Sequence, residues 1–283
     1  MVGPSSGKGR GPVESRALQE LLPGAVVLGG ASRDEALRRA RQAVAAGLDV
    51  LVAVGGDGTA HLALQAVAGT TTALSILPTG TGNDLAASLG VPTTAAATAQ
   101  AVLAGDSTAV DVVRFGSSWF ACILGTGFDA AVNERANRMR WPRGRRKYDL
   151  AILLELGTFR PQHLTLTLDG RREEHDVMLV ALGNAQSYGG GMRMCPDADL
   201  TDGLLDVVVV GPLSRRRLVR LFPRLFKGTH VQDASVTVRR AREVVLEGPP
   251  LAVYADGEPV GRLPLTCRVE PGALRVIGAR PGT

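Results

Sequence analysis

The sequence predicts two domains: an N-terminal α/β domain built on a parallel sheet, followed by a domain made mainly of β-strands. The 283 residues are too many for one ordinary hydrophobic core and suit two. The first third alternates short apolar runs with amphipathic stretches, which is typical of strands and helices around a parallel sheet. From about residue 112, strand-like runs are joined by Gly, Pro, Asp and Asn turns. The predicted domains are therefore 1–111 and 112–283, with the last strand allowed to return to the first domain.

The elements of the first domain follow from its hydrophobic pattern. Residues 48–54 (LDVLVAV) are apolar at almost every position, which indicates a parallel strand buried on both faces. Ser32 or Asp34 is suited to cap the preceding helix. Strands are predicted at 25–28, 48–54 and 73–77, helices at 34–46 and 60–68, and a turn at 55–59.

The second domain contains short strand-like runs with two helical inserts, at about 133–159 and 214–228. No repeat of fixed period is evident. The strand-like runs are 119–124, 164–168, 176–182, 205–210, 235–238, 243–246 and 274–277.

Composition limits the classes of protein to which the chain can belong. Hydrophobic residues at 45% and charged residues at 21% indicate a folded globular protein. A net charge of +5 favours an anionic partner. The three cysteines, Cys122, Cys195 and Cys267, have no CxxC spacing, which argues against a disulfide framework or zinc site and for a reducing compartment. With neither a signal peptide nor an apolar run long enough to span a bilayer, the protein is predicted to be cytoplasmic.

Two glycine-rich loops carry the clearest chemical signal. Residues 55–59 (GGDGT) follow a buried strand and precede a helix, whose N-terminal amides and dipole favour a bound anion. Taken alone, this loop is equally well explained as a strand-to-helix turn with Asp57 as a cap. Residues 78–84 (PTGTGND) repeat the arrangement after the next strand. Two such loops would meet at the carboxyl edge of one sheet, where α/β proteins bind ligands, so a nucleotide-phosphate site is the favoured interpretation.

Six motifs in order resemble the diacylglycerol kinase catalytic fold, which is shared by bacterial lipid kinases and sphingosine kinases. GGDGT alone also occurs in NAD kinases and phosphofructokinases, whereas GTGND together with PDADLTDGLLDV separates this chain from them. The motifs are PSSGKGR (4–10), VAVGGDGT (52–59), ILPTGTGND (76–84), LGNAQSYGGGM (182–192), CPDADLTDGLLDV (195–207) and DGEP (256–259).

The resemblance implies a phosphofructokinase-like α/β domain followed by a β-sandwich, with ATP and Mg²⁺ as cofactors. By motif match, the nucleotide is expected to be held by Ser6, Gly7, Gly56, Asp57, Gly58, Thr59, Gly80, Thr81, Gly82 and Asn83.

The resemblance also assigns roles to carboxylates that otherwise read as turn residues. A structural Mg²⁺ is implied at Asp199, Asp202 and the carbonyl of Leu204, where the residues alone favour a solvated hairpin turn. Some relatives have Lys in place of Asp199, so its main chain is an alternative ligand. Glu258, in what looks like an ordinary hairpin turn, is implied as the general base that takes the proton of a lipid hydroxyl.

Three further aspartates, Asp57, Asp84 and Asp111, are expected in an acidic network near the nucleotide and its metal; the alternative is that they cap helices or lie in loops.

Two segments mix basic and apolar residues, 138–147 and 214–228, and each holds six Lys or Arg. In the second, apolar residues recur at helical spacing, which suits the surface of an anionic membrane. The alternative is that this stripe packs on the β domain. Peripheral contact with an anionic membrane and a membrane lipid as substrate are therefore expected. Nucleic acid is not expected as a partner, since no nucleic-acid motif accompanies the charge.

The leading functional hypothesis is an ATP-dependent lipid kinase acting on diacylglycerol. A kinase of a soluble substrate such as NAD and a non-catalytic regulator that binds nucleotide or lipid are the alternatives. A homodimer is compatible with the sequence, which does not determine the oligomeric state.

Overall fold

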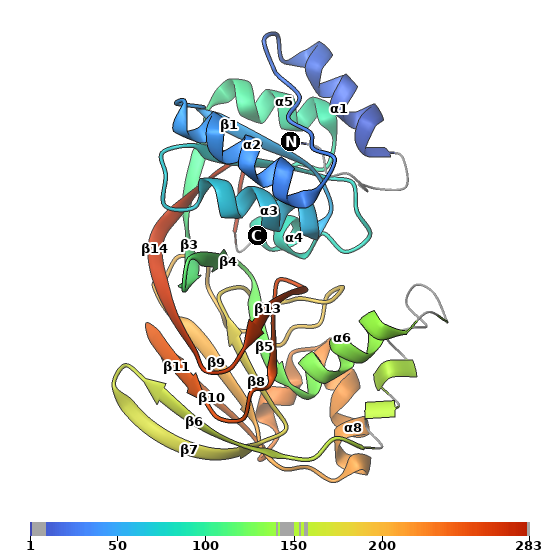
Figure 1. Cartoon of the computed structure of the whole chain (residues 1–283), viewed down its shortest axis with the longest axis vertical. Coiled ribbons are helices and arrows are strands. Elements are labelled where there is room, and N and C mark those ends of the chain that lie inside the picture. Colours follow the sequence, from blue (N-terminus) through green and yellow to red (C-terminus); the bar gives the residue numbers. More distant parts are fainter. Residues whose placement is uncertain (2–9, 140, 142–149, 153, 156–157, 282–283) are drawn as a thin grey trace. The chain divides into compact units, whose positions relative to one another are not determined.

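The chain divides into two compact units in a computed structural model that describes residues 1, 10–139, 141, 150–152, 154–155 and 158–281 (Figure 1). The first unit comprises Met1–Ala121, Asp199–Gly203 and Glu270–Thr283. The second comprises Cys122–Ala198 and Leu204–Val269. The fold is therefore an α/β unit with a parallel sheet and an antiparallel β-sandwich, and the sequence-based prediction of fold class is confirmed.

A short parallel sheet forms the centre of the first unit. Val54 of β1 lies opposite Leu77 of β2, and Val276 of β14 lies opposite Leu74, in parallel register. Met1 lies beside β1, where its amino group donates to the Val52 carbonyl at 2.5 Å. The elements of this unit are α1 (Arg10–Leu21), α2 (Arg33–Ala45), β1 (Val50–Gly55), α3 (Asp57–Val67), β2 (Ala73–Pro78), α4 (Asp84–Leu89), α5 (Ala95–Ala104), β3 (Ser107–Phe115), β4 (Ser118–Phe120) and the end of β14 (Leu265–Ile277).

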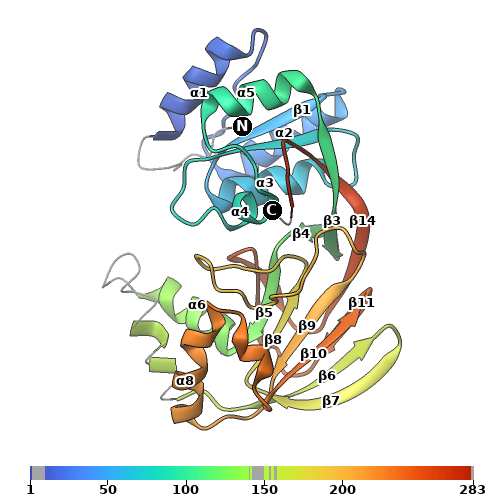
Figure 2. The ribbon, with the colours of Figure 1, turned by 180° about the vertical axis from the view of Figure 1, so that it is seen from behind.

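Helices cover both faces of this sheet (Figures 1 and 2). Leu18 and Leu22 from the α1 region pack with Ala99 of α5 on Val54 and Leu77. On the other side lie α2 and α3. Burial of these apolar side chains is the main stabilising contribution, at about 25 cal/mol for each Å² removed from water.

The predicted strands and helices of this unit are found, with one exception, and α3 already begins at Asp57, inside the turn predicted at 55–59. Ser32 caps α2 as expected, because its hydroxyl accepts from the Glu35 amide at 3.2 Å. The strand predicted at 25–28 is wrong: those residues belong to no strand, and Val26 and Val27 are exposed. The run is as apolar as a buried strand, but it does not pair with a neighbouring strand.

The first unit continues beyond the predicted boundary at residue 111, which falls inside β3. Arg114 of β3 pairs with Trp119 of β4. The side chain of Gln65, on α3, then fixes β4, since it accepts from the Trp119 amide at 2.9 Å and donates to the Trp119 carbonyl at 2.7 Å. Local sequence pattern does not predict long-range pairing of this kind.

The second unit contains two antiparallel sheets. The first has the strand order β10-β9-β8-β5-β12-β13, and the second is formed by the start of β14 with β11, β6 and β7. Its elements are β5 (Ile123–Gly127), α6 (Phe128–Arg138), β6 (Gln162–Leu168), β7 (Arg171–Val177), β8 (Leu179–Gly183), β9 (Leu205–Val210), α8 (Arg215–Leu225), the 3₁₀ helix η2 (Thr229–Gln232), β10 (Val236–Ala241), β11 (Glu243–Glu247), β12 (Ala252–Ala255) and β13 (Glu258–Arg262).

Several strands of this unit were missed or merged by the sequence prediction. The run predicted at 119–124 is divided between β4 and β5, and the run at 176–182 between β7 and β8. The sequence of β7, RREEHDV, is mostly polar because one face is exposed, and β13, EPVGR, contains Pro and Gly.

No helix in the described part of the chain is long and apolar enough to span a bilayer.

Asp111 ties distant segments of the first unit to β3. Its carboxylate is 3% exposed and accepts from the Gly203 amide at 2.7 Å and the Gly272 amide at 2.8 Å. Its own amide donates to the Leu200 carbonyl at 2.7 Å. These contacts anchor the turn at 199–203 and Gly272 of β14. The expectation that Asp111 belongs to an acidic network near the nucleotide stays a prediction.

We expect Asp111→Ala to lower the free energy of unfolding by about 2–4 kcal/mol, because two buried amides lose a charged acceptor. Chemical denaturation followed by circular dichroism measures the change. Asp106→Ala removes an exposed carboxylate beside β3 and serves as the control. Equal stability of the two variants would show that the Asp111 contacts contribute nothing.

Candidate active site

The two glycine-rich loops meet at the carboxyl ends of β1 and β2. The Thr79 amide donates to the Gly55 carbonyl at 2.8 Å, which continues the pairing of the strands into the loops. A Cβ atom added to Gly80 would lie 2.5 Å from the Gly56 Cα. Since this approach is backbone on backbone, neither loop has room for a side chain at the contact.

Asn83 closes the second loop. Its backbone is left-handed, with φ of 60°, and its side-chain oxygen accepts from the Gly80 amide at 3.1 Å. Its side-chain nitrogen donates to the Gly80 carbonyl at 2.9 Å, and its backbone amide donates to Asp57 Oδ2 at 2.8 Å. Asn tolerates the left-handed region better than most residues, which explains its place here.

Asp57 links the first loop to the second. Burial, followed by the nearby charge of Asp84, raises the pKa of Asp57, while hydrogen bonds from the amides of Asn83, Asp84 and Leu85 act in the opposite direction. A Cβ on Gly82 would lie 2.5 Å from Asp57 Oδ2, so the second loop encloses this carboxylate. Asp57 therefore joins the two loops, a contact that loop sequence alone did not reveal.

The structure brings together most of the residues predicted to hold a nucleotide. Gly58 and Thr59 lie in the first turn of α3, and Thr81 and Gly82 are exposed at the tip of the second loop. The N-terminus of α3 begins at the first loop, and amides at helix N-termini favour phosphate. The first amides of α4 already donate to Asp57. A surface formed by glycine backbones fits a phosphate chain. Ser6 and Gly7 lie outside the described residues.

The acidic turn at 199–203 has its own internal bonding. Asp199 Oδ1 accepts from the Thr201 amide at 2.9 Å and the Thr201 hydroxyl at 2.7 Å, while Asp202 is exposed. The described residues contain no cluster of three or more His, Cys, Asp or Glu side chains suited to a metal. Carboxylate and carbonyl oxygens are the ligand type that Mg²⁺ binds, and the Mg²⁺ site expected at Asp199, Asp202 and the Leu204 carbonyl stays a prediction.

Glu258 begins β13, immediately after a two-residue hairpin turn. Asp256 and Gly257 form that turn with φ of 51° and 81°, as a type I′ turn requires. The Asp256 carboxylate accepts from the Cys122 amide at 2.8 Å, and its amide donates to the Ile123 carbonyl at 3.0 Å. These bonds tie the turn to the start of β5 and so fix the half-buried Glu258, which lies opposite Ala255.

Family models match both parts of the chain. Residues 1–115 match the diacylglycerol kinase catalytic domain, and residues 122–278 match the YegS C-terminal NAD kinase beta sandwich-like domain. A diacylglycerol kinase of Mycobacterium tuberculosis is 44% identical over 263 residues, covering 90% of this chain and 85% of the relative. The chain belongs to the diacylglycerol kinase catalytic-domain family.

Other relatives agree with this lipid kinase family. A probable YegS-like lipid kinase of Pseudomonas aeruginosa is 32% identical, covering 86% of this chain and 80% of the relative. A solved structure, described as a putative diacylglycerol kinase from Bacillus anthracis, superimposes with a TM-score of 0.78 at 22% identity. It covers 100% of this chain and 97% of that one, and supports the fold.

Asp129 and Tyr188 of the kinase form a second polar centre, which the sequence analysis missed. Asp129 lies in the first turn of α6, and the hydroxyl of Tyr188 hydrogen-bonds to its carboxylate. Burial raises the pKa of Asp129 to about 6. Burial and the neighbouring Asp129 raise the pKa of Tyr188. The available signals were an Asp two residues after a glycine-containing strand, and a Tyr within the motif at 182–192.

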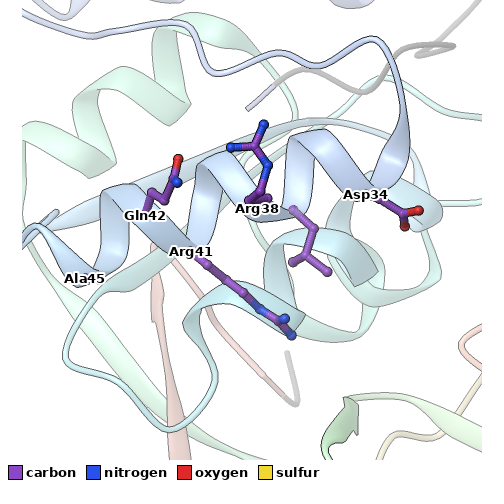
Figure 3. A pocket seen from close by; sticks show the side chains of 6 residues that line it. Asp34, Arg38, Arg41, Gln42 and Ala45 are labelled. Carbon is purple, nitrogen blue, oxygen red and sulfur yellow. The ribbon is translucent and has the colours of Figure 1, made fainter.

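A surface hollow of about 480 Å³ lies along α2 (Figure 3). It is lined by one helix. Arg41 from this helix reaches the Gln65 carbonyl of α3 at 3.4 Å, which is a packing contact. The lining residues are Asp34, Leu37, Arg38, Arg41, Gln42 and Ala45.

We expect Gly80→Ala to separate the two loops and to lower the free energy of unfolding by about 1–3 kcal/mol, because its Cβ would meet the Gly56 backbone. Kinase activity is expected to fall with it. Gly29→Ala is the matched control, since a Cβ there meets nothing within 4 Å. A Gly80→Ala protein as stable and as active as the control would contradict the close approach.

The raised pKa of Asp129 predicts a specific dependence of stability on pH. In the unfolded chain this carboxyl ionises near its ordinary value of 3.8, and in the folded chain near 6. The native protein therefore loses stability as pH rises from about 4 to 6, by about 2–3 kcal/mol, and stays at that lower level above pH 6. Asp129→Asn lacks this loss. Parallel stability curves for the two proteins between pH 4 and 7, from urea unfolding, would contradict the assignment.

Proposed function

We propose that the chain is an ATP-dependent lipid kinase that transfers the γ-phosphate of ATP to the free hydroxyl of diacylglycerol, yielding phosphatidate. The observation that carries the proposal is the side-chain-free contact between Gly56 and Gly80 at the N-terminus of α3. Such a surface presents backbone amides to an anion. The name of the Mycobacterium tuberculosis relative supports diacylglycerol as the acceptor.

Each unit is assigned a part of the reaction. Gly56, Gly58 and Thr81 of the first unit hold the phosphates through the backbone, and Asp57 keeps the loops in position. Gly80, whose amide donates to Asn83, contributes by having no side chain beside Gly56. Mg²⁺, when bound, neutralises charge on the transferred phosphate.

Glu258 is assigned as the general base. It accepts the hydroxyl proton as the lipid oxygen forms its bond to the γ-phosphorus and the bond from that phosphorus to the leaving ADP oxygen breaks. Support comes from its position: the hairpin turn is fixed to β5 by Asp256, so the side chain is presented from a rigid element.

A kinase assay with labelled ATP tests the proposal and separates the alternatives. The acceptors are diacylglycerol, sphingosine, ceramide and phosphatidylglycerol in mixed micelles, with NAD as the soluble acceptor because the C-terminal domain resembles that of NAD kinases. Labelled phosphatidate is the expected product. Label in NAD alone would reassign the enzyme to a soluble substrate, and nucleotide binding without any labelled product would indicate a regulator.

Glu258→Gln is expected to lower the turnover rate by about 10²–10⁴-fold, because the amide cannot accept the hydroxyl proton. Nucleotide binding and thermal stability should stay near those of the native protein. Glu247→Gln, at an exposed position in the second unit, is the control for loss of one carboxylate. Turnover by Glu258→Gln within threefold of this control would remove Glu258 from the mechanism.

A further inference from the structure

Helix α8 separates its basic and apolar side chains. At 100° per residue, Arg216, Arg217, Arg220 and Arg224 form one stripe. On another side, Leu221 is buried and Leu218 packs against the cluster of α6 that contains Phe128 and Val132. Figures 1 and 2 both show α8 beside α6. The apolar stripe therefore attaches the helix to the second unit, and the four arginines lie on a different side of the helix.

The arginines line a surface pocket of about 510 Å³. Asp233 is the acidic residue in this lining; it accepts from Arg217 at 2.7 Å and Arg224 at 3.4 Å. Arg216 and Arg220 are exposed and form no ion pair with any residue that the structure describes. The lining residues are Ser214, Arg216, Arg217, Arg220, Leu221, Arg224 and Asp233, so four guanidinium groups face one carboxylate.

The N-terminal end of α8 is also unfavourable without an anion. Arg215, Arg216 and Arg217 occupy its first turn, which contains no acidic residue. Cations at this end of a helix oppose the macrodipole. An anion bound at the pocket would offset both the dipole and the repulsion between guanidinium groups.

Exposed apolar side chains lie on the same helical segment. Val219 is 54% exposed and Phe226 is 39% exposed, and the ring of Phe226 meets that of Phe222 edge-on at 5.9 Å. Cations beside exposed apolar groups match the headgroup and acyl boundary of an anionic bilayer. A nucleic acid would pair with the arginines but would leave Val219 and Phe226 in water.

We propose that the α8 pocket binds the headgroup phosphate of an anionic phospholipid, and that this contact docks the kinase on the membrane that contains its substrate. The proposal rests on the proposed function for its choice of a lipid surface. It adds a binding site separate from Glu258 and from the glycine-rich loops.

Sedimentation with vesicles, in the absence of ATP, tests the site. The native chain should bind vesicles of phosphatidylcholine with phosphatidylglycerol, bind phosphatidylcholine alone weakly, and be released by added NaCl. Arg216→Gln with Arg220→Gln should weaken binding about 30-fold, since each cation near an anionic surface contributes about a factor of five. Both side chains are exposed, so the variant should keep its melting temperature. Val219→Ser should weaken binding at high as well as low salt.

The matched control is Arg242→Gln with Arg268→Gln, which removes the same charge from exposed positions on or beside the β11–β14 pair. Equal loss in both double variants, or loss in neither, would overturn the α8 site. Binding of a nucleic acid fragment that is tighter than vesicle binding and lost in the Arg216/Arg220 variant would assign the pocket to nucleic acid instead.

Turnover of a short-chain, water-soluble diacylglycerol separates this proposal from the proposed function. The Arg216/Arg220 variant should match the native protein on that substrate and be slower on diacylglycerol in vesicles. A native protein that binds vesicles through α8 but phosphorylates no diacylglycerol would refute the proposed function and leave the docking site standing.

Discussion

The contact between the Gly56 and Gly80 backbones is the constraint on which the candidate nucleotide site depends. It brings the start of α3 against the second loop, and the Asp57 carboxylate accepts from the first amides of α4. Asp57 maintains it at an electrostatic cost, since burial and Asp84 disfavour the ionised carboxylate while three backbone amides favour it. A carboxylate held in this way sets the shape of the loops before any ligand arrives, so binding requires little reorganisation.

The same unit depends on segments that return from far along the chain. Val276 pairs with β2, and residues 199–203 are held to β3 through Asp111. The acidic turn predicted to bind Mg²⁺ is therefore part of the first unit, although its sequence lies between strands of the second. Loop closure over such distances costs entropy, which the buried charged hydrogen bonds of Asp111 help to offset.

Sequence was sufficient where one local signal determined the structure. The apolar run at 48–54, the Ser32 cap and the glycine-rich loops each specified their element. Sequence was insufficient where pairing between distant segments determined the structure. Val26 and Val27 are apolar but belong to no strand, whereas the mostly polar β7 pairs with β6. The side chain of Gln65 holds β4 in the first unit, beyond the predicted domain boundary. The raised pKa of Asp129 could not be predicted either, because burial by distant residues is not visible in the neighbouring sequence.

The two predicted anion sites differ in whether Lys or Arg side chains are present. The loops at 55–59 and 79–83 contain no Lys or Arg, so phosphate held there would be stabilised by backbone amides, helix dipoles and a metal ion. On α8 the phosphate would instead meet side-chain guanidinium groups at an exposed surface. Amides on a rigid loop position a reacting group, whereas mobile, solvated arginines attract an anionic surface reversibly and with strong dependence on salt. The first chemistry suits catalysis and the second suits docking, which is the division of labour that a kinase of membrane lipids requires.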